Sequence, residues 1–253
     1  NDLGDYEKAK EYYGKSLEIR RKKLGAEHPR VAGNYNNLGV SCMNLGMYDE
    51  AIEYYERSLK IRRKAAGEEH PDVATSYGNL GGACSGKGRY DQALVYFEKS
   101  LSIRLKVLGS EHPDVATSHN NLGMTYDKKG ELDKAAKHLE KSLTILSQSF
   151  GEEHRSVLLC MGNLGAVYGR ARKDERSREL LERAIRVGLK SLGPEHPDLA
   201  NLFKNLGEFL IGLGEREKGR EALDTALSSF LKSLGEEHAR VGETHKLLGD
   251  LEL

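Results

Sequence analysis

The chain has 253 residues, of which 39 are Lys or Arg and 39 are Asp or Glu, so its formal net charge is zero with histidine neutral. This balance argues against a general electrostatic attraction to nucleic acid or to anionic membranes. No segment approaches the roughly 18 consecutive apolar residues of a membrane span, and no signal-peptide pattern opens the sequence. The composition therefore predicts no nucleic-acid partner and no membrane insertion.

A short loop sequence recurs six times at a fixed interval of 42 residues. Each copy opens with a glycine and carries a Glu-His pair two and three residues later. The opening glycines are Gly25, Gly67, Gly109, Gly151, Gly193 and Gly235. A strict period of this length is the signature of a stacked repeat array. We expect the glycine to end one helix in the left-handed conformation, and the proline that follows four of the histidines to lie in the first turn of the next helix.

The period divides residues 1–253 into a single repeat array. We expect a partial repeat at 1–24, full repeats at 25–66, 67–108, 109–150, 151–192 and 193–234, and a partial repeat at 235–253. Each full repeat holds a first helix after the loop and a second helix after a tight turn. Residues 1–4 match the end of a first helix, so the second helix is expected to begin at residue 5. Because the chain opens inside a repeat, and with Asn rather than Met, we expect a piece of a longer protein.

Apolar residues recur at steps of three and four in both expected helices of a repeat. In the first helix, Val31, Tyr35, Leu38 and Cys42 follow this spacing, which is typical of one face of a helix and not of a strand. The three cysteines have no metal-ligand spacing. We interpret them as reduced, buried, small apolar residues, which favours a cytoplasmic location.

One position in the middle of the first helix is glycine in all six copies. Glycine in a helix interior costs about 1 kcal/mol relative to alanine, so its recurrence indicates a close approach to the neighbouring helix. The residues are Gly39, Gly81, Gly123, Gly165, Gly207 and Gly249.

Several of these positions together resemble the tetratricopeptide repeat. Leu38-Gly39, Tyr126 in a later copy, Gly46-x-Tyr48, Ala51 and Tyr55 carry the resemblance, which covers the whole chain. It implies an all-α solenoid of helical hairpins that forms a right-handed superhelix. The 42-residue unit with Asn-Asn-Leu in its first helix is similar to the repeats of kinesin light chain. The repeats at 151–192 and 193–234 depart from the pattern at and after their turns, which predicts that these last two layers pack more loosely or lie near the end of the array.

Asparagine fills the position before the Leu-Gly pair in five successive first helices. The residues are Asn37, Asn79, Asn121, Asn163 and Asn205, and Asn36 and Asn120 precede two of them. The resemblance implies that the first helices line a concave groove and that the matching asparagines contact a cargo peptide. Amide side chains donate and accept hydrogen bonds, so such a row can hold an extended main chain without fixing its sequence. The alternative is that the amides bond the neighbouring layer and stiffen the solenoid.

Three cations in the later repeats are candidates for recognising an acidic peptide, because the resemblance implies that basic groove residues engage acidic side chains. They are Lys128, Arg170 and Lys204. Small or apolar residues on the same side would suit a neutral peptide instead: Val40, Met124 and Ala166. The lysine of a carboxylate-clamp repeat is missing where it is expected, since Asn36, Gly78 and Asn120 stand there.

The six Glu-His pairs predict no metal site, because one histidine per layer at roughly 10 Å spacing cannot build a tetrahedral site. A role in helix entry or between layers explains them better. No nucleophile–base pair or phosphate-binding loop is present in the sequence, so we expect no enzyme and no cofactor.

The sequence therefore predicts a non-catalytic cytoplasmic scaffold that binds a protein or an extended peptide, acidic or neutral, in cargo or adaptor recognition of the kinesin-light-chain kind. Two alternatives stay open. One is a structural or self-associating spacer array. The other is the sensor region of a larger nucleotide-switch signalling protein.

Overall fold

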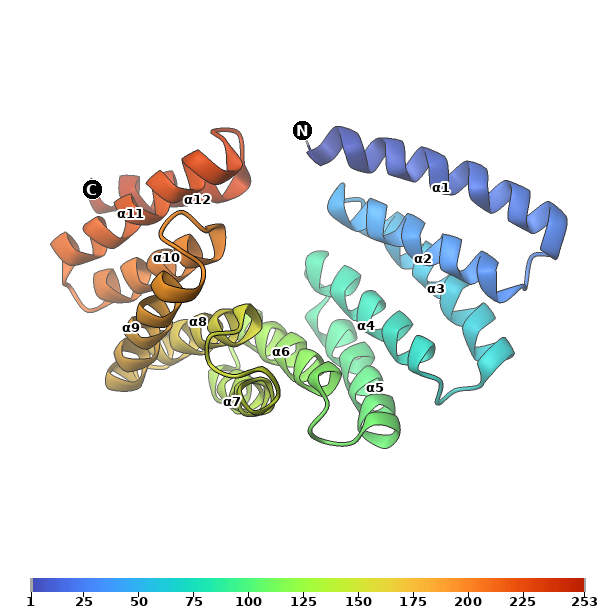
Figure 1. Cartoon of the computed structure of the whole chain (residues 1–253), viewed down its shortest axis with the longest axis horizontal. Helices are drawn as coiled ribbons and strands as arrows, with labels where there is room; N and C mark the ends of the chain where they lie inside the picture. Colours follow the sequence, from blue (N-terminus) through green and yellow to red (C-terminus); the bar gives the residue numbers. More distant parts are fainter. Residues whose placement is uncertain (1, 253) are drawn as a thin grey trace. The chain divides into compact units, whose positions relative to one another are not determined.

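The computed structural model describes residues 2–252. Within them the chain forms twelve α-helices and no strand, which confirms the all-α helical-hairpin fold (Figure 1). The first helices of the repeats are α2 (Pro29–Asn44), α4 (Pro71–Gly86), α6 (Pro113–Lys128), α8 (Arg155–Arg170), α10 (Pro197–Gly212) and α12 (Ala239–Glu252). The second helices are α1 (Asp2–Leu24), α3 (Tyr48–Ala66), α5 (Tyr90–Leu108), α7 (Leu132–Phe150), α9 (Asp174–Ser191) and α11 (Arg216–Leu234). No helix of this described part is long and apolar enough to cross a membrane.

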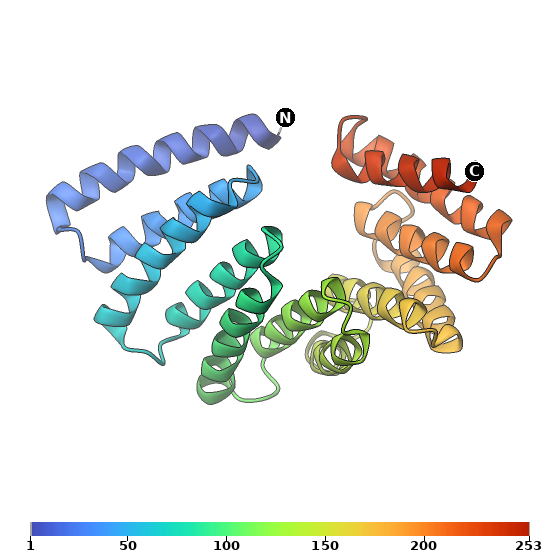
Figure 2. The same cartoon turned by 180° about the vertical axis from the view of Figure 1, so that it is seen from behind.

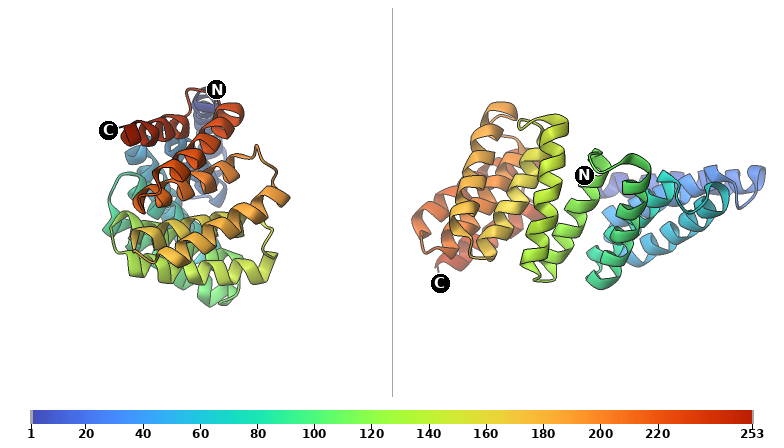
Figure 3. Two further views of the ribbon diagram at one scale, coloured as in Figure 1. Left: turned by 90° about the vertical axis from the view of Figure 1, so that its left-hand side faces the viewer. Right: turned by 90° about the horizontal axis from the view of Figure 1, so that it is seen from below.

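The chain divides into two compact units, unit 1 (Asn1–Lys129) with α1 to α6 and unit 2 (Gly130–Leu253) with α7 to α12. In unit 1 each helix packs against the next one along the chain (Figure 2). The same order holds in unit 2, where α10 also packs against α8 of the preceding repeat (Figure 3). The boundary lies between the two helices of the repeat at 109–150. The prediction of one continuous array over residues 1–253 therefore stays a prediction.

The core of each unit is a row of apolar side chains that recurs with the 42-residue period. One position of the first helix shows this most clearly, since its side chain is fully buried in both units: Val31, Val73, Val115, Val157 and Leu199. The three cysteines are free and buried, as expected. Because the buried positions share one period, each repeat covers the apolar face of the next.

The glycine in the middle of the first helix accommodates a side chain of the second helix in the same repeat. A Cβ atom added to Gly81 would lie 2.7 Å from the ring of Phe97, and one on Gly165 would lie 2.7 Å from Leu181. This confirms the predicted close approach in both units. For Gly249, where nothing lies within 4 Å among the described residues, the equivalent of Phe97 and Leu181 lies beyond residue 253, so the close approach stays a prediction there.

The glycine that ends each second helix has a positive φ, but it is not in the left-handed helical region that we expected. Gly67 has φ 87° and ψ 169°, whereas ψ in that region is about +47°. Its N–H still bonds the carbonyl of Arg63 at 3.0 Å. The physical reason is that the chain must continue in an extended direction to reach the next helix. This backbone region is open to glycine almost alone.

The histidine of each Glu-His pair caps the helix that follows. His112 Nδ1 accepts a hydrogen bond from the backbone N–H of Asp114 at 3.1 Å, and the other five copies make the same bond at 3.1 or 3.2 Å. The imidazole thereby satisfies one of the N–H groups that a helix leaves free at its start. The helix-entry role predicted for these histidines is confirmed.

The tight turn between first and second helix is present in the repeat at 151–192 although its glycine is replaced. Arg172 adopts φ 57° there, the one positive φ among the described non-glycine residues. The turn closes by a bond from the N–H of Lys173 to the carbonyl of Tyr168 at 2.9 Å, as it does from Met47 to Cys42 at 2.8 Å. Backbone hydrogen bonding therefore overrides the side-chain preference at this turn.

The first helix of the structure begins earlier than expected. We predicted a break after residue 4, but α1 runs from Asp2 to Leu24 and the backbone of Gly4 lacks the positive φ of Gly46. The turn at Gly46 depends on the carbonyl of Cys42. The residue equivalent to Cys42, one 42-residue period earlier, lies outside residues 1–253.

Candidate functional site

The asparagine row lies on the first helices, and all its members are half-buried. Two of them link one repeat to the next. Asn79 Nδ2 on α4 donates to Asn36 Oδ1 on α2 at 2.8 Å, and Asn205 Nδ2 on α10 donates to the carbonyl of Gly162 on α8 at 3.1 Å. In both units an amide thus bonds the neighbouring layer, which is the geometry expected of a stiffening role.

Other members of the row are not tied in this way. Among the residues that the structure describes, Asn37 and Asn121 are half-buried and their side chains make no hydrogen bond. Asn120 and Asn163 do interact with other described residues. A half-buried amide without a partner has its full capacity to donate and accept. The row therefore divides into amides that are used within the solenoid and amides that are available to a ligand.

The three predicted cations differ in their surroundings. Lys128 at the end of α6 and Arg170 at the end of α8 are exposed. The side chain of Lys204 on α10 is only 18% exposed, and its ammonium group lies 3.0 Å from Glu243 and 3.9 Å from Glu208. Lys204 is thus already neutralised by unit 2. The pKa of the Glu208 carboxyl is raised by burial, which the nearby charges of Lys204 and Arg170 oppose.

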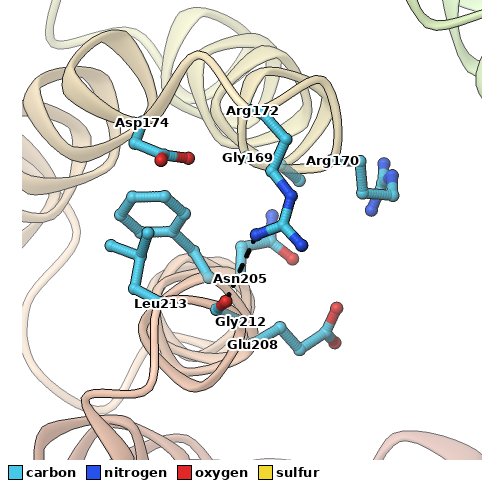
Figure 4. A pocket seen from close by; sticks show the side chains of 10 residues that line it. Gly169, Arg170, Arg172, Asp174, Asn205, Glu208, Gly212 and Leu213 are labelled. Carbon is cyan, nitrogen blue, oxygen red and sulfur yellow. Dashed lines mark hydrogen bonds between the residues drawn. The ribbon is translucent and has the colours of Figure 1, made fainter.

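A pocket of about 370 Å³ lies in unit 2 between α8 and α10. It is lined by Ala166, Gly169, Arg170, Arg172, Asp174, Asn205, Glu208, Phe209, Gly212 and Leu213. The predicted residues Arg170 and Asn205 are brought together here. Figure 4 shows Arg172 extending from the α8–α9 turn towards the end of α10, where its Nη1 donates to the carbonyl of Gly212 at 3.4 Å.

The pocket offers both donors and acceptors to a ligand. Asp174 points into it from the start of α9 (Figure 4), and its Oδ1 is buried without a hydrogen-bond partner among the described residues. Phe209 and Leu213 supply an apolar wall, while Arg170 and Glu208 stand at the outer edge. A buried carboxylate oxygen without a donor is costly, so this atom is suited to accept an N–H from a bound group.

Neither Arg172 nor Asp174 was among the predicted site residues. The signal that points to Arg172 is its position, because the equivalent residue of the other turns is Gly46, Gly88, Gly130 or Gly214. The signal for Asp174 is of the same kind, because the equivalent residue of the three preceding turns is Tyr48, Tyr90 or Leu132.

A second hollow, of about 670 Å³, lies in unit 1 between α3 and α5. It is larger and more cationic, but two of its cations are used within the protein, because Arg63 pairs with Glu68 and Lys64 pairs with Glu27. It also contains no member of the asparagine row. The pocket in unit 2 is therefore the better candidate. No group of three His, Cys, Asp or Glu residues in the described part of the chain could hold a metal ion.

The hairpin geometry and the polar first-helix face define a helical-repeat scaffold. Tetratricopeptide repeat models match residues 30–106, 85–148 and 128–189, and a second such model matches residues 1–30. The chain belongs to the tetratricopeptide repeat family. No curated protein matches it significantly.

Solved structures of similar fold include kinesin-light-chain-like repeats. Nearly identical TPR-like repeats assigned to a Podosopora anserina kinesin light chain are 26% identical, with a TM-score of 0.69 over 82% of this chain and 98% of that one. BtubC (BKLC) from P. vanneervenii is 22% identical, with a TM-score of 0.74 over 91% and 92% of the chains. The Rap protein complexed with competence and sporulation factor is 13% identical, with a TM-score of 0.67 over 99% and 71%.

Proposed function

We propose that the chain is a non-catalytic interaction scaffold that captures an extended segment of a partner protein along its first helices. The observation that carries this proposal is the pocket between α8 and α10, where guanidinium, amide and carboxylate groups surround an apolar wall. Such a set can bond the main chain of a peptide and bury one of its side chains. Cargo or adaptor recognition of the kinesin-light-chain kind is the form of capture that we favour.

The asparagine row supports capture of a main chain rather than of a fixed sequence. Asn37 and Asn121 hold amide groups with unused donors and acceptors on the first helices. An amide can donate to a peptide carbonyl and accept from a peptide N–H. The Rap protein of similar fold is itself complexed with competence and sporulation factor, so a solenoid of this kind can hold a bound factor.

A structural spacer role is the second candidate, because specific hydrogen bonds favour it. Asn79 and Asn205 each bond the preceding repeat, and the same bonds would stiffen an array that carries no ligand. The two functions differ in which asparagines matter. Asn37 and Asn121 matter for capture alone and Asn79 matters for a spacer, whereas Asn205 both lines the pocket and bonds the preceding repeat.

Two variants test the proposal against an array of random dodecapeptides. The first is Asn37→Ala with Asn121→Ala, which removes unpartnered amides. We expect its melting temperature to stay unchanged and its peptide affinity to fall, because each lost hydrogen bond is worth roughly 0.5–1.5 kcal/mol. The matched control is Asn79→Ala, which removes the bond to Asn36, leaves the pocket in unit 2 intact and should lower the melting temperature.

Absence of any peptide bound by the wild-type chain would contradict capture and leave the spacer role. Equal affinity in the wild type and in the Asn37→Ala, Asn121→Ala variant would remove these two residues from the site. Calorimetric titration with one selected peptide, beside circular dichroism melting of the same samples, separates these outcomes.

A further inference from the structure

The turn between α8 and α9 holds an arginine in a backbone conformation that favours glycine. Four equivalent turns have glycine with φ between 72° and 85°, at Gly46, Gly88, Gly130 and Gly214. Arg172 has φ 57° at the same position. An L-residue with a side chain is strained there because its Cβ approaches the following carbonyl. One turn of the protein thus carries backbone strain that the other four avoid.

The contacts of Arg172 inside unit 2 do not account for this strain. Its guanidinium makes a hydrogen bond to the carbonyl of Gly212 at 3.4 Å, which is longer than the usual range of about 2.7–3.2 Å. A guanidinium has five N–H donors in a planar fork. Strained residues of this kind cluster at ligand sites, where the side chain is placed for a function.

The surroundings of Arg172 indicate what kind of group the pocket takes. The side chain extends over the space bounded by Asn205 and Leu213 (Figure 4). Across that space, Asp174 Oδ1 is buried and has no donor among the described residues. The pocket therefore suits a ligand that has an anionic group to bind the guanidinium of Arg172 and an N–H group to donate to Asp174. A peptide segment with a carboxylate has both.

We propose that Arg172 is a specificity-determining residue of unit 2 that binds a carboxylate of the captured peptide. The two oxygens of the carboxylate accept two parallel N–H bonds from the guanidinium, the geometry in which arginine is most selective for this group. Asp174 accepts a main-chain N–H of the same peptide, and Phe209 packs against its aliphatic part. This inference rests on the proposed function, because it specifies the partner chemistry of the same site.

The carboxylate can come from an acidic side chain or from the free C-terminus of a peptide. An array of random hexapeptides synthesised twice, with amidated and with free C-termini, distinguishes the two sources. Enrichment of Asp and Glu on the amidated array assigns the side chain. Binding confined to the array with free C-termini assigns the terminal carboxylate.

Arg172→Gly is the deciding variant, because it restores the residue of the other turns and removes the guanidinium without damaging the fold. We expect its affinity for a selected peptide to fall at least tenfold. For the analogue in which the carboxylate is an amide, wild type and variant should bind equally. Arg172→Lys should recover only part of the affinity, since an ammonium lacks the fork. Arg186→Ala on the exposed side of α9 is the matched control and should bind as the wild type.

The possible results separate this inference from the proposed function. If no peptide binds the wild-type chain, both are overturned. If peptides bind but Arg172→Gly retains the wild-type affinity, or loses affinity equally for the carboxylate and amide analogues, the inference about Arg172 alone is overturned. A tenfold loss confined to the carboxylate peptide supports it.

Discussion

Unit 1 and unit 2 join their repeats by different chemistry at one position of the second helix. In unit 1 this position is arginine. Arg62 Nη1 donates to the carbonyl of Asp72 at 3.0 Å and to Ser76 Oγ at 2.9 Å. Arg104 repeats the arrangement one period later, with Ser118 Oγ at 2.9 Å. Each arginine clamps the second helix of one repeat to the first helix of the next.

In unit 2 the same position is apolar or glycine, and its partner changes with it. The position is occupied by Leu146, Gly188 and Phe230, all buried. The residue 14 positions further on, which is serine beside Arg62 and Arg104, is Cys160 after Leu146, Leu202 after Gly188 and Thr244 after Phe230. A Cβ on Gly188 would already lie 3.7 Å from Leu202.

The difference shows that the 42-residue repeat can form this contact between helices with either polar or apolar side chains. It requires that the pair fills its space and leaves no polar group unsatisfied, because either failure is costly. An arginine–serine pair meets the requirement in unit 1. In unit 2 it is met by apolar neighbours after Leu146 and Gly188, and beside Phe230 by Thr244, whose hydroxyl donates to the carbonyl of Arg240 at 2.8 Å. A buried arginine without a polar partner should fail.

The largest expected effect comes from exchanging one member of a pair between the units. Leu146→Arg places an arginine among buried apolar groups of unit 2 and should cost roughly 3 kcal/mol or more, because the charge has no partner. Adding Cys160→Ser, which supplies the hydroxyl present in unit 1, should recover part of that loss. Chemical denaturation of the single and double variants measures both. No recovery in the double variant would show that the two positions are not coupled.

The next effect tests the glycine that accommodates the second helix. Gly81→Ala should destabilise unit 1 by about 1–3 kcal/mol, because its Cβ would lie 2.7 Å from the ring of Phe97. The neighbouring Gly82→Ala is a matched control, since nothing lies within 4 Å of its Cβ. That variant should be stabilised by up to about 1 kcal/mol through helix propensity. Melting curves in which the two alanines shift stability alike would contradict the close-packing account.

A smaller effect concerns the histidine caps. His112→Ala removes the acceptor for the N–H of Asp114 and should cost about 1 kcal/mol, as loss of a helix N-cap does. His112→Asn keeps an acceptor of comparable reach and should retain most of the stability. Equal losses in the two variants would indicate that the imidazole stabilises the loop through packing and not through the cap.

The smallest expected effect is a pH dependence at the edge of the pocket. The pKa of Glu208 is raised by burial, so the folded chain binds its proton more strongly than the unfolded chain. The stability contributed by protonated Glu208 is fully present below the ordinary glutamate pKa of about 4.3. It is lost as the pH rises through the raised pKa of Glu208 in the folded chain. The stability of the wild type relative to Glu208→Gln should therefore fall from pH 4 towards neutral pH. Parallel melting temperatures of the two across that range would contradict the direction of the shift.

The fold could be predicted from the sequence because its signals repeat. The spacing from Gly25 to Gly67 gave the repeat length. The glycine that recurs in the middle of the first helices predicted where the first and second helices approach closely. The hydrogen bonds between neighbouring repeats could not be predicted, because they depend on which residues of the two repeats face each other. Asn79 bonds the preceding repeat because Asn36 stands opposite, and Asn205 does so through a carbonyl. The ψ angle of Gly67 was equally inaccessible, since glycine permits several conformations.

The candidate site was predicted only in part for a similar reason. Asn205 was predicted because asparagine recurs at its position in five first helices, and Arg170 was predicted because it is a cation near that row. Both predictions needed only the residue type and its position in the repeat. Arg172 and Asp174 contribute through the turn that places them, and the sequence pattern there predicted loose packing. The structure keeps that turn closed, so the departure from glycine adds a guanidinium to the pocket and does not open the repeat.

Nuclear magnetic resonance of the labelled chain with a peptide selected on the array tests the central claim most directly, because it reports where the ligand lies. We expect shift changes within unit 2, at the Arg172 guanidinium and at the backbone amides of Asn205 and Phe209. Residues that face outward on the second helices, such as Val95 and Leu189, should not respond. Shift changes confined to those second-helix residues, with none on α8 and α10, would contradict capture along the first helices.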